Sequence, residues 1–399
     1  MEVIYISSVC NPSNIEKIDQ TALKKLEVSG IKFHNLLMKG FIENNVGVTS
    51  IIGLPISRAT NKKIFWKKQI EKKQKIEYHQ VGFINLPILK QLTTAIHILK
   101  AYIQYGRKKD NVYTIIDATY VSVIPFILLA NKFLHIPTIG IVADIYDYMC
   151  DVDNNNGKNK KVSNWLRKKN QANYLKMDGF ILLTEQMNEV INLNHKPYIV
   201  IEGCSDSNMR IENNIKKNEK RVILYSGKLA EKFGIKLLVE AYKKLQQTDI
   251  ELWIYGDGEE KEYVVQQSEQ DTSIKYKGFV SNQEVIKAQL AATLLVNPRP
   301  TSGQFTKYSF PSKNIEYMAS GTPMLTTKLV GMPKEYYDYV FFIEEETVDG
   351  LYKVMNEILE KPIGDLKQKG LEAKEFILNN KNEKIQAKKI TNFIKGVKR

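Results

Sequence analysis

The sequence predicts an α/β protein built from two doubly wound, Rossmann-like domains that face each other across a cleft. Apolar, β-branched segments of strand length alternate with amphipathic helical segments over most of the 399 residues. Alternation of this kind favours parallel sheets with helices on both faces. The pattern occurs twice, and the polar segment 205–221 separates the two runs. The chain is also long for a single hydrophobic core, which favours two domains.

The first run predicts a domain over residues 1–205. It begins with an apolar strand and a helix, and it continues with alternating elements up to the polar segment. The predicted strands are 2–8, 48–54, 113–119, 138–144, 179–184 and 198–203, and the predicted helices are 31–44, 121–134 and 185–193.

The second run predicts a domain over residues 206–382. Its strands are 221–227, 250–258, 274–280, 293–299 and 322–328, and helices are predicted at 235–245, 282–292 and 312–319. Open α/β sheets bind ligands at the carboxyl ends of their strands, and ligands often sit between domains. We therefore expect a ligand in the cleft between the two sheets.

Composition limits the class of protein. A net charge of +14 and a pI of about 9.3 predict an anionic partner. Charge alone does not choose among a nucleotide, a nucleic acid and an acidic membrane face. The three cysteines are far apart in the sequence and predict neither a disulfide framework nor a metal site, which fits a reducing, cytoplasmic compartment. The first residues predict a strand and not a signal peptide, and polar residues interrupt the most apolar segment, 115–137.

A glycine and two lysines lie between a predicted strand and helix at residues 224–245. Gly227, Lys228 and Lys232 occupy this short connection. A helix N-terminus carries a partial positive charge and free N–H groups, so two ammonium groups beside it would suit a diphosphate. The alternative is that the lysines are only solvated.

A second informative segment is "YSFPSKNIEYMASGTPMLTT", residues 308–327. Pro311 prepares the chain to enter a helix, and Gly321 is placed to end it. Glu316 lies in the first turns of this helix. A carboxylate there would accept hydrogen bonds from both hydroxyls of a ribose, or it would simply stabilise the helix N-terminus.

Together, "SGKLAEKFG" and "FPSKNIEYMASGTPML" resemble the retaining nucleotide-sugar glycosyltransferases of the GT-B fold, family 4 type. The resemblance implies that Lys228 and Lys232 bind the donor diphosphate and that Glu316, the second Glu of an E-x7-E element, binds the donor ribose. It also implies that the loops around Gly256 and Phe279 surround the nucleotide base, and that the last helix, 383–399, crosses back to the first domain.

The first half resembles the family only in pattern, and the chain departs from the family at several positions. Tyr308 stands where the first Glu of E-x7-E is expected, and Ala143 stands where a His is expected before Asp144. The segment "SSVCNPSN" replaces a Gly-rich loop. These departures concern the donor sugar and the acceptor more than the nucleotide.

The resemblance implies transfer of a sugar from a nucleoside diphosphate to a hydroxyl with retention of anomeric configuration. Lys228 and Lys232 would stabilise the departing diphosphate, and Asp144 would orient the acceptor or sugar, or serve as a helix cap or ion-pair partner. Neither a metal nor a cofactor is expected. The remaining donor-binding candidates are Gly227, Ser312, Lys313, Asn314 and Arg299.

The basic segment 61–75 suggests a further partner. Its lysines and its apolar Ile64, Phe65, Trp66 and Ile70 could lie on an anionic inner leaflet near a lipid-linked saccharide acceptor. The alternative is a solvated helix whose Phe and Trp dock on the first domain.

Three functions compete. The main hypothesis is a glycosyltransferase of surface polysaccharide or glycoconjugate synthesis. A nucleotide-sugar epimerase of the same fold would need acid and base residues in the cleft. A catalytically degenerate subunit would keep only nucleotide affinity, in line with Tyr308 and Ala143. Nucleic-acid binding is not expected, because no platform of stacking aromatics interleaved with basic residues is evident.

Overall fold

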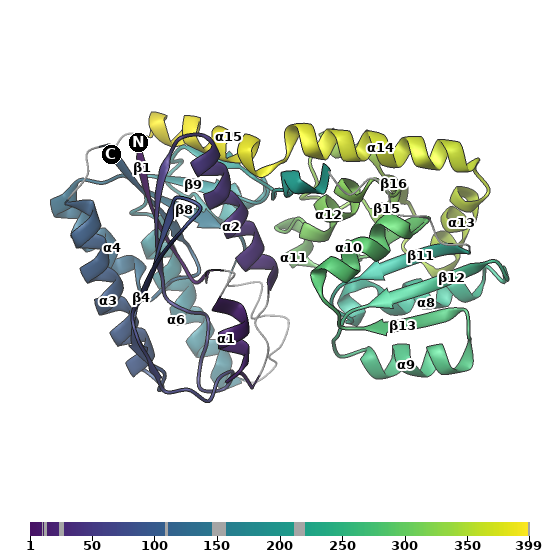
Figure 1. Cartoon of the computed structure of the whole chain (residues 1–399), viewed down its shortest axis with the longest axis horizontal. Helices are drawn as coiled ribbons and strands as arrows, with labels where there is room; N and C mark the ends of the chain where they lie inside the picture. The colour runs from purple at the N-terminus through teal and green to yellow at the C-terminus, as the bar shows by residue number, and fades with distance from the viewer. Residues whose placement is uncertain are drawn as a thin grey trace. The chain divides into compact units, whose positions relative to one another are not determined.

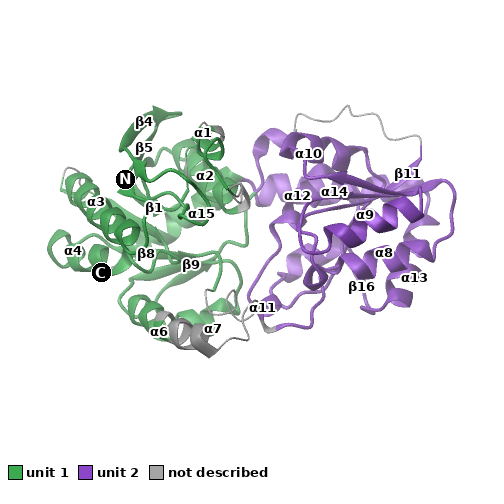
Figure 2. Cartoon of the chain, turned by 90° about the horizontal axis from the view of Figure 1, so that it is seen from below, with its two compact units in different colours: residues 1–204, 383–399 green, residues 205–382 purple. Residues whose placement is uncertain are grey.

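The computed structural model describes residues 1–9, 11, 14–23, 28–107, 111–145, 157–210 and 220–397. The chain divides into two compact units, shown in Figure 2. Unit 1 comprises Met1–Cys204 with Glu383–Arg399, and unit 2 comprises Ser205–Asn382. Each unit is built on a largely parallel sheet, which confirms the α/β fold class. Of the polar segment 205–221, Ser207–Arg210 forms a 3-10 turn and residues 211–219 lie outside the described residues.

Unit 1 contains an eight-stranded sheet in the order β10-β9-β8-β7-β1-β2-β5-β4. All neighbouring strands are parallel except β4 and β5. The chain builds outward from β1 on one side through β2 and then on the other through β7, so the switch point of the sheet lies between β1 and β7. The strands are β1 (Glu2–Ser7), β2 (Gly47–Ile52), β4 (Gln69–Lys73), β5 (Ile76–Gln80), β7 (Val112–Asp117), β8 (Thr138–Val142), β9 (Gly179–Leu182) and β10 (Tyr198–Val200).

The helices of unit 1 include two long ones early in the chain and one that returns from its C-terminal end. They are α1 (Ile15–Asp19), α2 (Val28–Glu43), α3 (Leu89–Gly106), α4 (Ile124–Leu134), α6 (Gly157–Tyr174), α7 (Met187–Ile191) and α15 (Glu383–Gly396). Among the described residues, no helix combines the length and the apolar composition that crossing a membrane requires.

The expected helix within residues 61–75 is wrong. This segment forms β3 (Phe65–Trp66), paired with β6 (Phe83–Ile84), and β4, paired with β5 in an antiparallel hairpin. Gln74 and Lys75 have φ angles of 49° and 66°, the left-handed conformation that a tight hairpin turn requires. Trp66 does dock on the unit, because its ring stacks on Phe83 at a centroid distance of 5.9 Å.

Unit 2 contains a six-stranded, fully parallel sheet in the order β13-β12-β11-β14-β15-β16. The sequence of its central strand, "RVILYS", is mostly apolar, as expected for a strand whose side chains are buried on both faces of the sheet. Ile223 and Tyr225 pack with one core, and Val222 and Leu224 pack with the other. The strands are β11 (Arg221–Ser226), β12 (Ile250–Tyr255), β13 (Ile274–Gly278), β14 (Leu294–Asn297), β15 (Met324–Thr327) and β16 (Phe341–Ile343).

The helices of unit 2 cover both faces of this sheet. One core contains residues of α8, α9 and α13, and the other contains residues of α10 and α12 and most of the buried residues of α14. Their bounds are α8 (Ile235–Lys243), α9 (Lys261–Gln270), α10 (Asn282–Ala291), α11 (Gln304–Lys307), α12 (Ser312–Ser320), α13 (Val348–Leu359) and α14 (Ile363–Asn380). Gly321 ends α12 with φ 79°, as the sequence predicts.

Helix α15 lies against α2, far away in sequence but in the same unit (Figure 1). Lys39 Nζ lies 2.5 Å from Oε1 of Glu383, whose side chain is fully buried. A Cβ atom at Gly40 would come within 2.0 Å of the Glu383 carbonyl oxygen. The glycine therefore permits the close approach of the two helices.

Replacing Gly40 tests this contact. We expect Gly40→Ala to lower the free energy of unfolding by about 1–3 kcal/mol, because an added methyl group overpacks a backbone contact. Gly30→Ala in the same helix is the matched control, since no other described part of the chain comes within 4 Å of the position its Cβ would take. That variant should be neutral or more stable by up to about 1 kcal/mol. Urea unfolding measures both, and equal effects would contradict the assignment.

Candidate functional site

The loops that follow β11 and β12 pack backbone against backbone. Gly227 has φ 153° and Gly256 has φ 137°, both in the region that favours glycine. A Cβ atom at Gly256 would lie 1.8 Å from the carbonyl oxygen of Gly227. The N–H of Gly227 donates to the Tyr255 carbonyl at 3.0 Å, and the N–H of Leu229 donates to the Asp257 carbonyl at 2.9 Å. The two loops thus form one layer at the carboxyl edge of the sheet.

Lys313, near the start of α12, reaches over this layer. Its Nζ lies 2.5 Å from the position that a Gly227 Cβ would occupy, and 4.2 Å from the centroid of the Tyr225 ring. Burial, reinforced by the charge of Arg299, lowers the pKa of Lys313 to about 7, although the nearby Glu316 opposes this shift. An amine held in this way would gain from an anion that restores its favourable charged form.

Arg299, which follows β14, lies between two aromatic rings. Its guanidinium carbon is 5.3 Å from the Phe233 centroid and 4.8 Å from the Phe305 centroid. Lys232 Nζ lies 5.8 Å from the same Phe233 ring. Contact with aromatic rings restricts the movement of a guanidinium group. Arg299 therefore places a second positive charge near Lys313. Arg299 and Lys232 also contact the same Phe233 ring.

The structure places the other predicted residues of unit 2 as follows. Lys228 is exposed, and its carbonyl accepts the Tyr225 hydroxyl at 2.8 Å. Glu316 is half-buried on α12, and its charge acts on Lys313. Ser312 is the exposed first residue of α12. Phe279 follows β13 and is 63% exposed.

Asn314 belongs to the interior of unit 2, and Asp144 belongs to unit 1. Asn314 is fully buried, and its Oδ1 accepts a 2.7 Å hydrogen bond from Asn297, so its side chain faces the interior of unit 2. Asp144 is an exposed residue of unit 1, in the bend that follows β8. The structure therefore brings Gly227, Lys313, Arg299 and Glu316 together and gives Asn314 an internal role.

Sequence reasoning missed the aromatic residues that support the site. Tyr317 follows Glu316 on α12, and its hydroxyl accepts the Ser226 N–H at 2.7 Å. The Gln289 amide donates to the Ser226 hydroxyl at 3.1 Å. These bonds fasten the end of β11 to two helices. The available signal was the Tyr in the middle of α12, and the sequence pattern alone does not distinguish it from an ordinary core residue.

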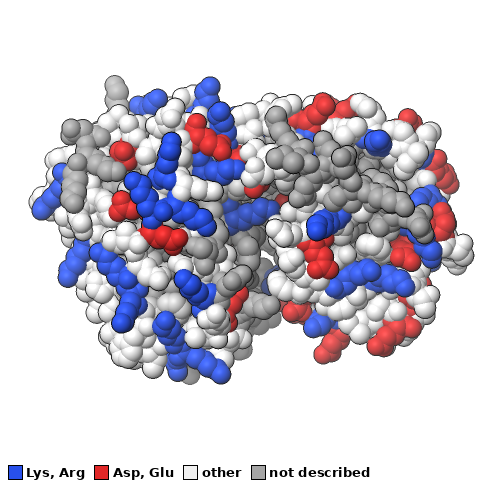
Figure 3. Space-filling model, in the orientation of Figure 1, with Lys and Arg blue, Asp and Glu red and all other residues white. Residues whose placement is uncertain are grey.

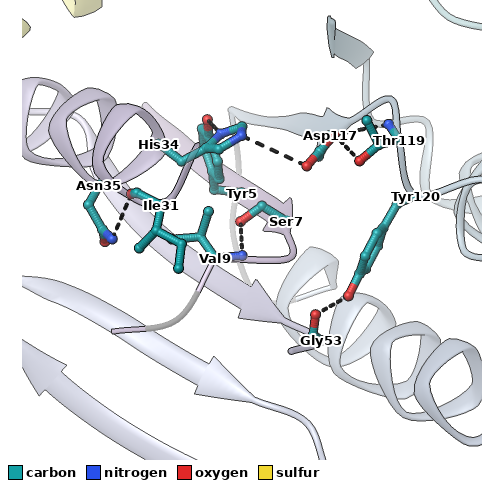
Figure 4. Close-up of polar contacts among 10 residues, drawn as sticks. All are labelled: Tyr5, Ser7, Val9, Ile31, His34, Asn35, Gly53, Asp117, Thr119 and Tyr120. Carbon is teal, nitrogen blue, oxygen red and sulfur yellow. Dashed lines mark hydrogen bonds and ion pairs between the residues drawn. The ribbon is translucent and has the colours of Figure 1, made fainter. Parts of the chain in front are cut away.

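A second polar cluster, also missed, lies in unit 1 (Figure 4). The Tyr5 hydroxyl and His34 Nδ1 are 2.6 Å apart, and His34 Nε2 lies 3.8 Å from Asp117 Oδ2. Asp117 Oδ1 accepts the N–H and hydroxyl of Thr119 at 2.9 and 2.7 Å. Burial lowers the pKa of His34 more than Asp117 raises it. The signal was an Asp at the end of an apolar strand, at the switch point of the sheet.

Within the part of the chain that the structure describes, no group of three or more His, Cys, Asp and Glu side chains is arranged to hold a metal ion.

The Lys313 pKa has a measurable consequence. The folded protein holds this proton less tightly than the unfolded chain does, so unfolding takes up a proton between about pH 7 and pH 10.5. Stability from this group therefore rises as the pH rises through that window. We expect the unfolding free energy of Lys313→Met to increase less than that of wild type between pH 7 and pH 9 in urea titrations. Lys287→Met, an exposed position on α10, should keep the wild-type dependence; identical slopes in all three would refute the assignment.

Comparison with known proteins identifies the domain that carries these cations. Residues 206–383, nearly the whole of unit 2, match the family model described as "Glycosyl transferases group 1". No curated protein matches the chain.

The similar solved structures cover the chain from end to end. Sucrose-phosphate synthase from Thermosynechococcus elongatus has 12% identity and a TM-score of 0.68, over 99% of this chain and 98% of that one. HepE of Anabaena in complex with UDP has 12% identity and a TM-score of 0.65, over 99% and 100%. The catalytic domain of starch synthase IV from Arabidopsis thaliana has 10% identity and a TM-score of 0.67, over 100% and 99%. The chain thus has the GT-B fold, and residues 206–383 match the glycosyltransferase group 1 family model.

Proposed function

We propose that the protein is a glycosyltransferase that moves a sugar from a nucleoside-diphosphate sugar to a hydroxyl, with retention of anomeric configuration. The observation that carries the proposal is that Lys313 reaches over the glycine layer of the group 1 domain, with Arg299 close enough for its charge to lower the Lys313 pKa. Two cations beside a close backbone turn match a diphosphate better than any neutral ligand.

Electrostatic stabilisation of the leaving diphosphate is the proposed catalytic contribution. Negative charge grows on the diphosphate as its bond to the sugar breaks, and fixed cations aimed at that charge lower the barrier. Lys228 and Lys232, from the turn before α8, would act with Lys313 and Arg299. We propose that these side chains take the place of a metal ion and that the reaction uses no other cofactor.

The remaining donor contacts follow from position. Glu316, half-buried on α12 near Lys313, would accept the ribose hydroxyls. The loops at Gly256 and Phe279 would surround the base, and the exposed Ser312 would contact the diphosphate from the start of α12. Gly227 would leave room for the phosphates to approach the backbone.

We place the acceptor with unit 1, where Asp144 would orient it. HepE has been solved with UDP and with UDP and glucose, and TarM of S. aureus with UDP and saccharides. These complexes support a nucleotide-sugar donor and a saccharide or lipid-linked saccharide acceptor. A cytoplasmic enzyme of surface polysaccharide or glycoconjugate synthesis, with peripheral contact to an anionic membrane, is consistent with the basic chain.

One observation favours a second function. Tyr308, half-buried before α12, stands at the position where the resemblance places an acidic residue. A chain without that carboxylate could bind the nucleotide and fail to turn over the sugar. Such a degenerate subunit would show nucleotide affinity without donor hydrolysis or transfer.

Nucleotide binding is the first test. We expect UDP, GDP or ADP at millimolar concentration to raise the melting temperature of the full chain, whereas single-stranded oligonucleotides should not. Lys228→Ala and Glu316→Ala should each weaken the stabilising nucleotide about 10-fold or more, because each removes a charged hydrogen bond. Lys287→Ala is the control that should bind as wild type does. Preference for oligonucleotides, or undiminished affinity in both site variants, would overturn the assignment.

Catalysis is tested separately. A screen of donor hydrolysis over common sugar nucleotides should identify one substrate, and Lys232→Ala should reduce its turnover by about 100-fold. NMR of the first-formed product should show the anomeric configuration of the donor. An inverted product would exclude retention, and binding without any hydrolysis or transfer would favour the degenerate subunit.

A further inference from the structure

A pocket lies wholly within unit 1, between α1 and the segment that carries β3 and β4. Its volume is about 280 Å³, close to the lower end of the range for small-ligand sites. The residues that line it come from α1, from the segment just before it, and from the neighbouring strands and connections. They are Asn14, Lys17, Ile18, Lys63, Phe65, Trp66, Lys67, Gln69 and Gln80.

Buried amide groups face this pocket. Gln80, the last residue of β5, is only 6% exposed, and it lines the pocket. Asn14 is 8% exposed and donates one long hydrogen bond, 3.4 Å, to Gln69 Oε1. Side-chain amides carry both N–H donors and a carbonyl acceptor. The pocket therefore presents amide groups that can bond the hydroxyls of a ligand.

The charge around the pocket has one sign. Lys17, Lys63 and Lys67 line it, and no Asp or Glu is among the lining residues that the structure describes. Lys63 is held in place, because its Nζ lies 4.6 Å from the Trp66 ring and its carbonyl accepts the Trp66 indole N–H at 3.2 Å. Figure 3 shows that Lys and Arg side chains outnumber Asp and Glu over the face of unit 1 that carries β4. Clustered cations of this kind attract an anionic ligand.

The pocket also has apolar walls and lies at the carboxyl edge of the sheet. Ile18, Phe65 and Trp66 supply apolar surface beside the amides, and Phe65 is 68% exposed. Aromatic surface covers the C–H groups of a sugar ring, while amide groups bond its hydroxyls. Gln80 ends β5, and α1 follows β1, so the pocket lies at the carboxyl edge of the sheet, where open α/β sheets bind ligands.

We propose that this pocket binds an acidic saccharide, a sugar that carries a carboxylate or phosphate group, as part of the acceptor. The amides of Gln80 and Asn14 bond the hydroxyls, and Lys63 and Lys67 bind the acidic group. Its role as acceptor rests on the proposed glycosyltransferase function, but the binding itself is independent of any donor and is measured without one.

Calorimetry of the full chain with paired probes tests the proposal. Trigalacturonate and glucose 6-phosphate are the acidic probes, and maltotriose and glucose are their neutral counterparts. At least one acidic probe is expected to bind 10-fold or more tightly than its counterpart. Gln80→Leu, of similar size but without the amide, should weaken that binding about 10-fold. The double variant Lys63→Gln/Lys67→Gln should remove most of the preference for the acidic probe.

The matched control removes the same charge outside the pocket. Lys72→Gln/Lys73→Gln changes two exposed lysines of β4 that do not line it, and it should bind the acidic probe as wild type does. Equal loss in both double variants would mean that net charge and not the pocket attracts the anion, which would overturn the proposal. Equal binding of acidic and neutral probes, or of neither, would also overturn it.

Vesicles distinguish a saccharide site from a membrane surface. Phosphatidylcholine vesicles with 30% phosphatidylglycerol are the probe, and sedimentation is the measurement. Vesicle binding that depends on Lys63 and Lys67 but not on Gln80, without acidic-sugar binding, would assign the lysines to a lipid surface and refute the saccharide site. If nucleotides raise the melting temperature while no acidic sugar binds, only the present inference fails. If acidic sugars bind and nucleotides do not, the donor assignment fails instead.

Discussion

The close approach of two backbone turns, at Gly227 and Gly256, is the constraint on which the site in unit 2 depends. A Cβ atom at Gly256 would lie 1.8 Å from the Gly227 carbonyl oxygen, so side chains at this point would force the loops after β11 and β12 apart. Because Gly227 carries no side chain, the amine of Lys313 reaches over the same turn. Tyr317 and Gln289 then fix Ser226 from two helices. The Lys313 amine can take this position because neither Gly227 nor Gly256 carries a side chain.

Without a bound anion, the arrangement of charges in this site is electrostatically unfavourable. Lys313 is desolvated against Tyr225 and repelled by Arg299, and its pKa falls for these two reasons. Arg299 is stacked between Phe233 and Phe305, which limits its movement. A dianionic group placed beside both would relieve the repulsion, and little rearrangement would be needed because the cations are already oriented.

The sequence predicts local features of this molecule well and long-range ones poorly. Hydrophobic periodicity, together with proline and glycine positions, predicts the strand before Gly227 and the helix that Gly321 ends. The structure contains both. The contact of Lys313 with Gly227 joins residues far apart in the chain, and no local pattern encodes it. The sequence predicts a donor-binding role for Asn314, and the structure buries its side chain, where Asn297 donates a hydrogen bond to it. Within residues 61–75, lysines and aromatics suggest a helix, but pairing with β5 and β6 decides for strands.

Helix α15 has a consequence for how the chain is made. The hydrophobic core of unit 1 contains Ala387, Ile390 and Ile394 together with Leu37 and Phe41. During synthesis, the ribosome releases these closing residues only after the whole of unit 2 has emerged. The first unit to be translated is therefore the last whose apolar surface is fully covered, and a nascent chain stalled before residue 383 leaves α2 exposed to chaperones and to aggregation.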